Sequence, residues 1–182
     1  KHFCRKGEMY LLNDNYFFYG LKHTRPLKEQ KNYMDFLNIV KKSKNEWIKN
    51  KLELCMPIFS YVKRGNLFYK GDIILSKLSG ETLDKTLMKR LKFNIEEEIG
   101  LCFRFLFNNG IYNFDMNLTN IIYNQETDKF SFIDFDKVII NSRKTNSQGF
   151  SSRVIDKFRD SLKKYDLFVN FDWNKFVRSV YG

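Results

Sequence analysis

Residues 110–136 read GIYNFDMNLTNIIYNQETDKFSFIDFD, and this stretch carries the most informative pattern in the chain. Asp115 and Asn120 lie five positions apart in a polar segment, and Asp134 follows the apolar residues of a predicted strand. Such oxygen-bearing side chains can surround one or two Mg²⁺ ions. Phosphoryl transfer needs metal to hold the phosphates and a carboxylate to receive or orient the acceptor hydroxyl. We therefore expect a phosphotransferase site, and the alternative is a surface Asp-Asn turn beside an ordinary strand end.

The residues around this stretch show both helix and strand patterns. Apolar residues at helical spacing predict helices over 25–40, 82–91, 94–110, 150–165 and 173–181, with Asn94 as an N-cap and Gly110 closing the third helix. Alternating and β-branched residues predict strands over 58–62, 67–69, 73–75, 121–123 and 130–133, the first three forming a β-meander. The basic segment 41–51 is expected to be a solvated face or loop, and 111–120 a polar loop.

Composition narrows the class of protein. The chain has 182 residues, 43% of them hydrophobic and 17% aromatic, which suits a folded core and excludes disorder. No stretch approaches the roughly 20 apolar residues of a membrane-spanning helix. Three widely spaced cysteines indicate reduced thiols, and only two histidines argue against a zinc site or a Ser-His-Asp hydrolase. A β-rich first part and a helical second part predict an α+β fold with two lobes, residues 1–78 and 79–182.

The stretch 110–136 resembles the protein-kinase-like superfamily, and within it the lipopolysaccharide core kinases, above all the 3-deoxy-D-manno-octulosonic acid (Kdo) kinases. The pattern of those kinases is H-x-D-L-N-x-x-N-I-L followed by L-I-D-F-D. This chain has NFDMNLTNII at 113–122 and FIDFD at 132–136. Further likeness lies in KHFCRKG at 1–7, TRPLKE at 24–29 and GNLFYKGDII at 65–74. The resemblance implies a bilobal kinase-like fold whose glycine-rich loop and first strands lie upstream of Lys1, so the N-lobe is expected to be incomplete here.

The resemblance also implies roles for individual residues. Asp115 matches the catalytic-loop Asp, and Asn120 and Asp134 match the two metal-binding positions. Glu29 matches the helix acid that pairs with an ATP-binding lysine, which is Lys1 by motif position or else Lys22. The backbone of 76–78, including Lys77 and Leu78, is expected to meet the adenine.

The resemblance also bears on three further positions in the motif. Asn117 stands where protein kinases carry a Lys that faces the transferred phosphate, and it either contacts phosphate or closes the loop. Asp136 either helps to bind metal or caps the next turn. Asn113 replaces the usual His of this motif, and we expect its amide to support the loop backbone instead.

Together these features imply an ATP- and Mg²⁺-dependent kinase that phosphorylates a hydroxyl of Kdo, by analogy the 4-hydroxyl, on a lipid A precursor. A net charge of +11 suits an acidic glycolipid and peripheral binding to the anionic cytoplasmic face of the inner membrane. The alternatives are a kinase for a core heptose, a small-molecule alcohol or a protein Ser, or an inactive pseudokinase that binds partners. A nucleic-acid-binding protein is disfavoured, because the lysines are spread through the chain and no known binding motif occurs.

Overall fold

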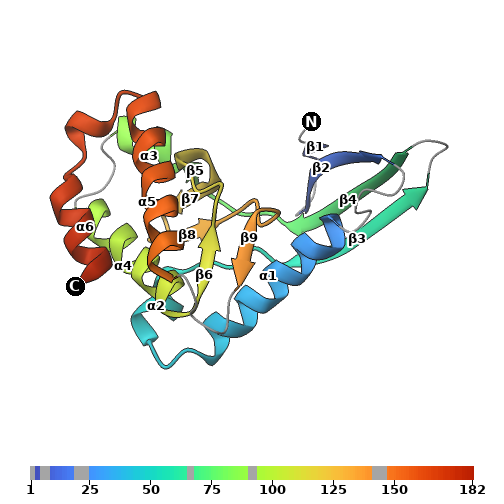
Figure 1. Cartoon of the computed structure of the whole chain (residues 1–182), viewed down its shortest axis with the longest axis horizontal. Helices are drawn as coiled ribbons and strands as arrows, with labels where there is room; N and C mark the ends of the chain where they lie inside the picture. The colour runs from blue at the N-terminus through green and yellow to red at the C-terminus, as the bar shows by residue number, and fades with distance from the viewer. Residues whose placement is uncertain (1–2, 5–8, 19–24, 65–67, 90–93, 141–146) are drawn as a thin grey trace.

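The computed structural model describes residues 3–4, 9–18, 25–64, 68–89, 94–140 and 147–182. Figure 1 shows an elongated molecule with an antiparallel sheet at one end, a group of helices at the other, and one long helix beside the sheet. The expected α+β fold is confirmed. The division into lobes at residues 78 and 79 stays a prediction.

The sheet near the N-terminus contains four antiparallel strands in the order β1-β2-β4-β3. They are β1 (Phe3–Cys4), β2 (Met9–Phe18), β3 (Pro57–Arg64) and β4 (Phe68–Ser76). The predicted strand 58–62 lies within β3, and the segments 67–69 and 73–75 belong for the most part to one long strand, β4. Residues 65–67, between β3 and β4, lie outside the described residues. Because β2 pairs with β4 on the side away from β3, the sheet is not a simple meander.

Helix α1 (Arg25–Lys42) packs against β3, β4 and β9 (Val138–Ile140) and so joins the sheet to the rest of the chain. Its apolar stripe is buried as predicted, and Pro26 is its second residue, where a missing N–H costs little. The buried stripe comprises Tyr33, Phe36, Leu37 and Val40.

The segment 41–51 corrects one expectation. Of the two structures expected, the loop was wrong and the solvated face holds: most of the segment is helical, α1 continues to Lys42, and α2 spans Glu46–Lys51, with every residue except Ile48 at least partly exposed. Asn45 caps α2, because its Oδ1 accepts a hydrogen bond of 3.2 Å from the Ile48 backbone N–H. Ile48 is buried in the core and Trp47 packs against it, so two apolar residues anchor this otherwise polar segment.

The remaining chain is mostly helical around two small sheets. The helices are α3 (Leu83–Met88), α4 (Ile95–Asn108), α5 (Ser147–Lys164) and α6 (Trp173–Tyr181). One sheet has the order β5-β7-β8 and the other pairs β6 with β9. Their strands are β5 (Glu81–Thr82), β6 (Ile111–Asn113), β7 (Ile121–Asn124) and β8 (Lys129–Phe132). The four helices predicted in this part and the strands at β7 and β8 are confirmed, although α3 ends earlier than residue 91.

One local expectation in this part was wrong. The segment 111–120 begins with a buried strand, β6, which pairs with the unpredicted β9. Asn94 does occupy the N-cap position of α4, as predicted, but its backbone is left-handed (φ 62°) and its side chain makes no capping bond; its Oδ1 accepts from Lys175 instead. Gly110 does close the helix with a positive φ of 69°, as expected.

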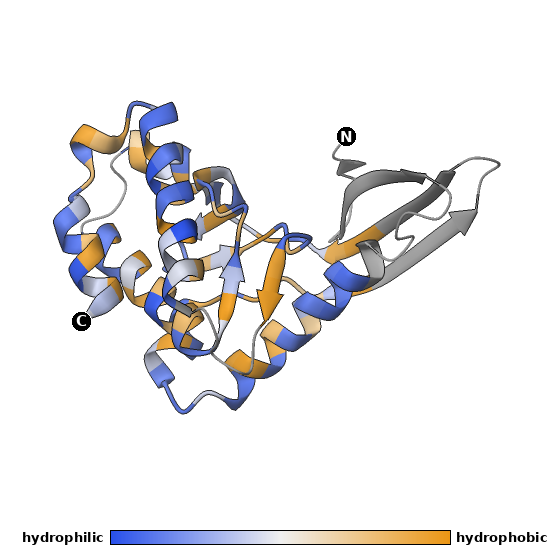
Figure 2. Ribbon diagram, in the orientation of Figure 1, coloured by the Kyte–Doolittle hydropathy of each residue, from blue (hydrophilic) through white to orange (hydrophobic). Residues whose placement is uncertain are grey.

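The core between these helices and sheets is rich in aromatic rings. Phe103 lies 5.1 Å from Phe158 and 5.3 Å from Phe176, measured between ring centroids. Hydrophilic residues occupy the exposed turns of α1 and α5 (Figure 2). None of the described helices is long and apolar enough to cross a bilayer.

Candidate active site

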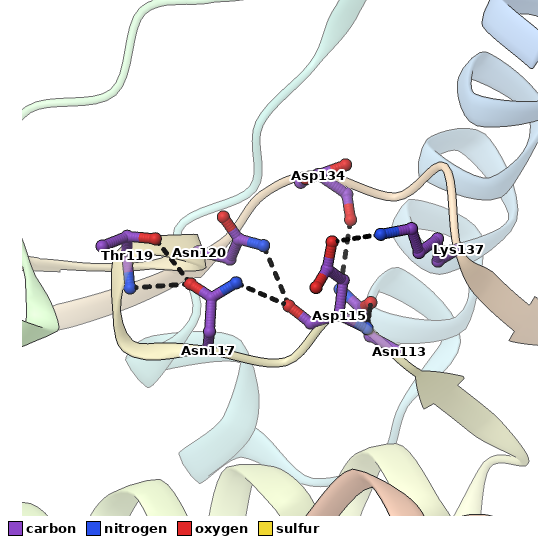
Figure 3. Close-up of polar contacts among 7 residues, drawn as sticks. All are labelled: Asn113, Asp115, Asn117, Thr119, Asn120, Asp134 and Lys137. Carbon is purple, nitrogen blue, oxygen red and sulfur yellow. Dashed lines mark hydrogen bonds and ion pairs between the residues drawn. The ribbon is translucent and has the colours of Figure 1, made fainter. Parts of the chain in front are cut away.

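The loop after β6 is held in shape by its own polar side chains (Figure 3). Asn113 Oδ1 accepts a bond of 2.9 Å from the Asp115 N–H. The side-chain amides of Asn117 and Asn120 donate to the Asp115 carbonyl at 3.1 and 2.9 Å. The Leu118 N–H donates to Ser161 Oγ on α5 at 3.0 Å, which ties the loop to the helices. These bonds satisfy backbone groups that a polar loop would otherwise leave unpaired.

The strand β8 delivers Asp134 next to this loop. The Ile133 N–H donates to the Asn120 carbonyl at 3.0 Å, and Asn113 Nδ2 donates to the Asp134 carbonyl at 3.1 Å. Asn113 therefore bridges the two halves of the motif, which is the supporting role expected of it. Asp134 has a positive φ of 62°, a conformation that Asp tolerates better than most residues.

Helix α1 fixes the segment that follows Asp134. The Asp134 N–H donates to the Tyr33 hydroxyl at 3.0 Å. Asn32, which is buried, donates through Nδ2 to the carbonyls of Phe135 at 2.8 Å and Val138 at 3.2 Å. The Phe135 ring packs against the Tyr33 ring with centroids 4.4 Å apart. No sequence pattern indicated these roles of Asn32 and the Tyr33 hydroxyl, because their partners lie about 100 positions away along the chain.

Negative charge accumulates where the loop and strand meet. Burial, followed by the charges of Asp136 and Asp115, raises the pKa of Asp134 from 3.8 to about 6. Lys137 Nζ forms an ion pair of 2.6 Å with Asp115 Oδ2, and this bond raises the pKa of Lys137. Burial also raises the pKa of the Tyr33 hydroxyl. The pair Asp115–Lys137 was not anticipated, although Lys137 directly follows the FIDFD motif.

A cavity of about 550 Å³ opens beside these residues. Its apolar lining comes from β4 and the segment after it, from β7, and from the segment after β8, and its polar lining includes Glu29, Asn120 and Asp134. The apolar lining residues are Leu75, Leu78, Ile122 and Ile133. A volume of this size with apolar walls and a few convergent polar groups is typical of small-molecule sites.

The structure brings together some of the expected site residues but not all of them. Glu29, Leu78, Asn120 and Asp134 line this cavity, and Asp115 is hydrogen-bonded to Asn120 at its edge. Lys77 is exposed and does not line the cavity, although its neighbours Ser76 and Leu78 do. Asn117 does not line it either, and its side chain closes the loop. Lys1 and Lys22 lie outside the described residues.

Cys55 and Lys85 also line the cavity and were not predicted as site residues. Burial raises the pKa of the Cys55 thiol to about 12, and its Sγ donates to the Ser76 carbonyl. It is therefore a neutral wall residue and not a nucleophile. Cys102 is buried as well, and among the described residues Cys55 and Cys102 are not joined in a disulfide.

The donors at this site fit Mg²⁺ better than a transition metal. Within the described part of the chain, no group of three or more His, Cys, Asp or Glu side chains could hold a metal. Asn120 and Asp134 offer hard oxygen ligands, and Mg²⁺ typically takes one or two carboxylates together with phosphate oxygens and water. Burial is the main cause of the raised pKa of Asp134, and the negative charges of Asp136 and Asp115 add to it; a bound divalent cation would offset those charges.

Comparison with known proteins identifies the family. The family model described as "Lipopolysaccharide kinase (Kdo/WaaP) family" matches residues 1–180. The chain belongs to this family, which confirms the resemblance seen in the sequence. Membership supports a lipopolysaccharide-related kinase, and thus a phosphotransferase, and it implies the use of ATP, typically with Mg²⁺. No curated protein matches the chain significantly.

Solved structures of WbdD are similar over much of the chain. One at 2.2 Å resolution has 17% identity and a TM-score of 0.48 over 82% of this chain and 33% of its own. Another, of the bifunctional kinase-methyltransferase WbdD, has 16% identity and a TM-score of 0.46 over the same shares. Monomeric WbdD has 17% identity and a TM-score of 0.47 over 96% of this chain and 42% of its own. The chain therefore spans less than half of those WbdD chains.

Proposed function

We propose that this chain is an ATP- and Mg²⁺-dependent kinase that phosphorylates a hydroxyl, in the first place the 4-hydroxyl, of Kdo on a lipid A precursor. The proposal includes an N-lobe of residues 1–78 and a C-lobe of residues 79–182 with the cavity between them. The observation that supports it best is that Asn120 and Asp134 both line that cavity and that Asn120 is hydrogen-bonded to Asp115 at its edge.

The nucleotide is held by the cavity in this proposal. The adenine lies between the apolar walls, and the backbone of 76–78 offers it hydrogen-bonding groups. Glu29 is almost fully buried, at 1% exposure, so it would act on an ATP-binding lysine from inside the cavity. Lys1 and Lys22 remain the candidates for that lysine.

Asp115 carries out the proton step in this proposal. Its carboxylate takes the proton of the acceptor hydroxyl while the oxygen attacks the γ-phosphorus, and a positioned base of this kind contributes about 10²–10⁴-fold in rate. Asn120 and Asp134 would hold Mg²⁺, which neutralises phosphate charge when bound. Asn113, Tyr33 and Asn32 keep the loop and the strand end in place through the bonds described above.

The acceptor and the location follow from charge and family. The net charge of +11 favours an acidic, phosphorylated glycolipid and an anionic membrane surface. We therefore propose peripheral binding at the cytoplasmic face of the inner membrane.

The test is phosphate transfer from ³²P-labelled ATP with Mg²⁺ to Kdo-lipid A, with Asp115→Asn as the inactive control. Labelled Kdo-lipid A that depends on Asp115 supports the proposal. Labelling of a heptose-containing core, a small alcohol or protein Ser instead would keep the kinase and replace the acceptor. Nucleotide binding without transfer to any acceptor would indicate a pseudokinase and refute the proposal.

A further inference from the structure

Asn117 contributes no charge to the site and is engaged in holding the loop. Its Nδ2 donates to the Asp115 carbonyl at 3.1 Å, and its Oδ1 accepts from the Thr119 N–H at 3.0 Å and from the Thr119 hydroxyl at 2.5 Å. Turning the Asn117 side chain toward a phosphate would take its Oδ1 away from the Thr119 N–H and hydroxyl, whereas the Asp115 carbonyl would still accept from Asn120. Of the two roles expected for Asn117, the geometry favours closing the loop. The transferred phosphoryl group then needs a cation from elsewhere.

Lys137 is a cation that already contacts the catalytic carboxylate. Its Nζ lies 2.6 Å from Asp115 Oδ2, and its side chain is 51% exposed (Figure 3). The backbone holds it there, because the Phe114 N–H donates to the Lys137 carbonyl at 3.5 Å. Lys137 directly precedes β9, whose first residue, Val138, pairs with Asn113 of β6.

This ion pair is weak enough to exchange. A pair in which one partner is half-exposed contributes roughly 0–1 kcal/mol to stability, since solvent screens it. The lysine ammonium sits on a flexible stem with three donors. A triphosphate carries more negative charge than one carboxylate, so the ammonium can move from Asp115 to a phosphoryl oxygen without loss of fold stability.

The geometry of transfer brings that oxygen within reach. The acceptor oxygen must be hydrogen-bonded to Asp115 and at the same time lie about 3–3.5 Å from the phosphorus that it attacks. The Lys137 ammonium, which contacts the Asp115 carboxylate, therefore lies close to the position of the phosphoryl oxygens. Positive charge aimed at these oxygens stabilises the transition state, and three carboxylates nearby (Asp115, Asp134 and Asp136) make such a charge more necessary.

We propose that Lys137 is a catalytic residue: its ammonium breaks the ion pair with Asp115 and contacts the γ-phosphoryl group of ATP during transfer. The inference rests on the proposed kinase function and adds the cation that its site requires. The bond from the acceptor oxygen to the γ-phosphorus forms, and the bond from that phosphorus to the β,γ-bridging oxygen breaks. ADP leaves with the electron pair, the acceptor proton passes to Asp115, and Lys137 keeps its own protons throughout.

The test measures which phosphate the lysine contacts. Binding of ADP and of the non-hydrolysable analogue adenosine 5′-(β,γ-imido)triphosphate is measured by calorimetry with Mg²⁺ for the parent protein and for Lys137→Met, Lys137→Gln and Lys137→Arg. We expect the two neutral variants to bind the imido analogue about tenfold more weakly and ADP as the parent does, while the Arg variant keeps most of its affinity. Lys157→Met, an exposed lysine of α5, is the matched control and should bind both ligands normally.

A background of Asp115→Asn separates contact from positioning. If Lys137 contacts the phosphoryl group, Lys137→Met weakens binding of the imido analogue in this background as well. If Lys137 only orients Asp115, the second substitution has no further effect, and the proposal is overturned. The proposal is also overturned if Lys137→Met weakens the binding of ADP and of the analogue equally, or weakens the binding of neither.

Nucleotide binding by the parent protein separates failure of the proposed function from failure of this inference. A parent that binds neither nucleotide with Mg²⁺ refutes the proposed function and this inference together. A parent that binds both and transfers phosphate, with Lys137→Met unchanged, refutes the inference alone.

Discussion

Asp134→Asn is expected to make the metal-free protein more stable while it destroys the metal site. The Asp134 carboxylate is partly buried near Asp136 and Asp115. Burial, followed by the charges of these two residues, raises its pKa to about 6. Asparagine has nearly the same size and tolerates the positive φ at this position. The backbone bonds to Tyr33 and Asn113 use the N–H and the carbonyl of residue 134, so the substitution leaves them in place.

The magnitude follows from the pKa. A rise from 3.8 to about 6 corresponds to at most about 3 kcal/mol. Because the carboxyl is partly exposed, solvent screening reduces this to about 1 kcal/mol. The folded state holds this proton more tightly than the unfolded state, so the parent protein loses stability as pH rises from about 4 to about 6 and does not regain it above. The Asn variant has no such loss.

Thermal unfolding without metal, followed by circular dichroism between pH 4 and pH 8, tests this. The variant should melt about 2–4 °C above the parent at pH 7, and the gap should close toward pH 4. With Mg²⁺ and ATP at about 100 times the dissociation constant, the parent should gain about 2.7 kcal/mol and the variant far less. Below pH 6 the parent's Mg²⁺ affinity should fall, because protons compete for Asp134.

The control is Asp160→Asn, an exposed carboxylate on α5 far along the chain from the site. It should change neither the melting temperature nor the response to Mg²⁺ and ATP. A metal-free Asp134→Asn protein less stable than the parent at pH 7 would show that the carboxylate is a structural partner. Equal stabilisation of both proteins by Mg²⁺ and ATP would remove Asp134 from the metal site.

Three further substitutions test the surroundings of the site. Asp115→Asn should lower Mg²⁺-dependent turnover by at least about 100-fold with an unchanged melting curve, and global unfolding would indicate a structural role instead. Tyr33→Phe should cost about 1–3 kcal/mol in urea unfolding, because the Asp134 N–H loses its acceptor; an unchanged midpoint contradicts this. Gly80→Ala should cost more than about 2 kcal/mol, because φ is +113° and a Cβ would lie 2.3 Å from a β7 carbonyl oxygen. Its control, Gly149→Ala, meets no atom within 4 Å in α5 and should stabilise slightly; similar effects at both positions would refute the steric argument.

Local patterns in the sequence were sufficient to predict most helices and the class of protein to which the motif belongs. The periodic apolar residues of α1, α4, α5 and α6 each need one buried face, and that requirement is visible in the order of residues alone. The motif from Asn113 to Asp136 likewise contains the residues that we propose as metal ligands and as the base. Membership of the lipopolysaccharide kinase family confirms the class that this motif indicated.

Contacts between distant parts of the chain decided the rest. Strand β9 and the hydrogen bonds of Asn32 and Tyr33 depend on partners that come together only when α1 docks on the segment after Asp134. The pairing of Lys137 with Asp115, and the engagement of Asn117 within the loop, likewise result from the folded path of the backbone. The sequence determined which chemical groups are available, because composition and spacing are local properties. Only the tertiary structure decided which of them are occupied in holding the loop and which face the cavity, because hydrogen-bond partners compete in three dimensions.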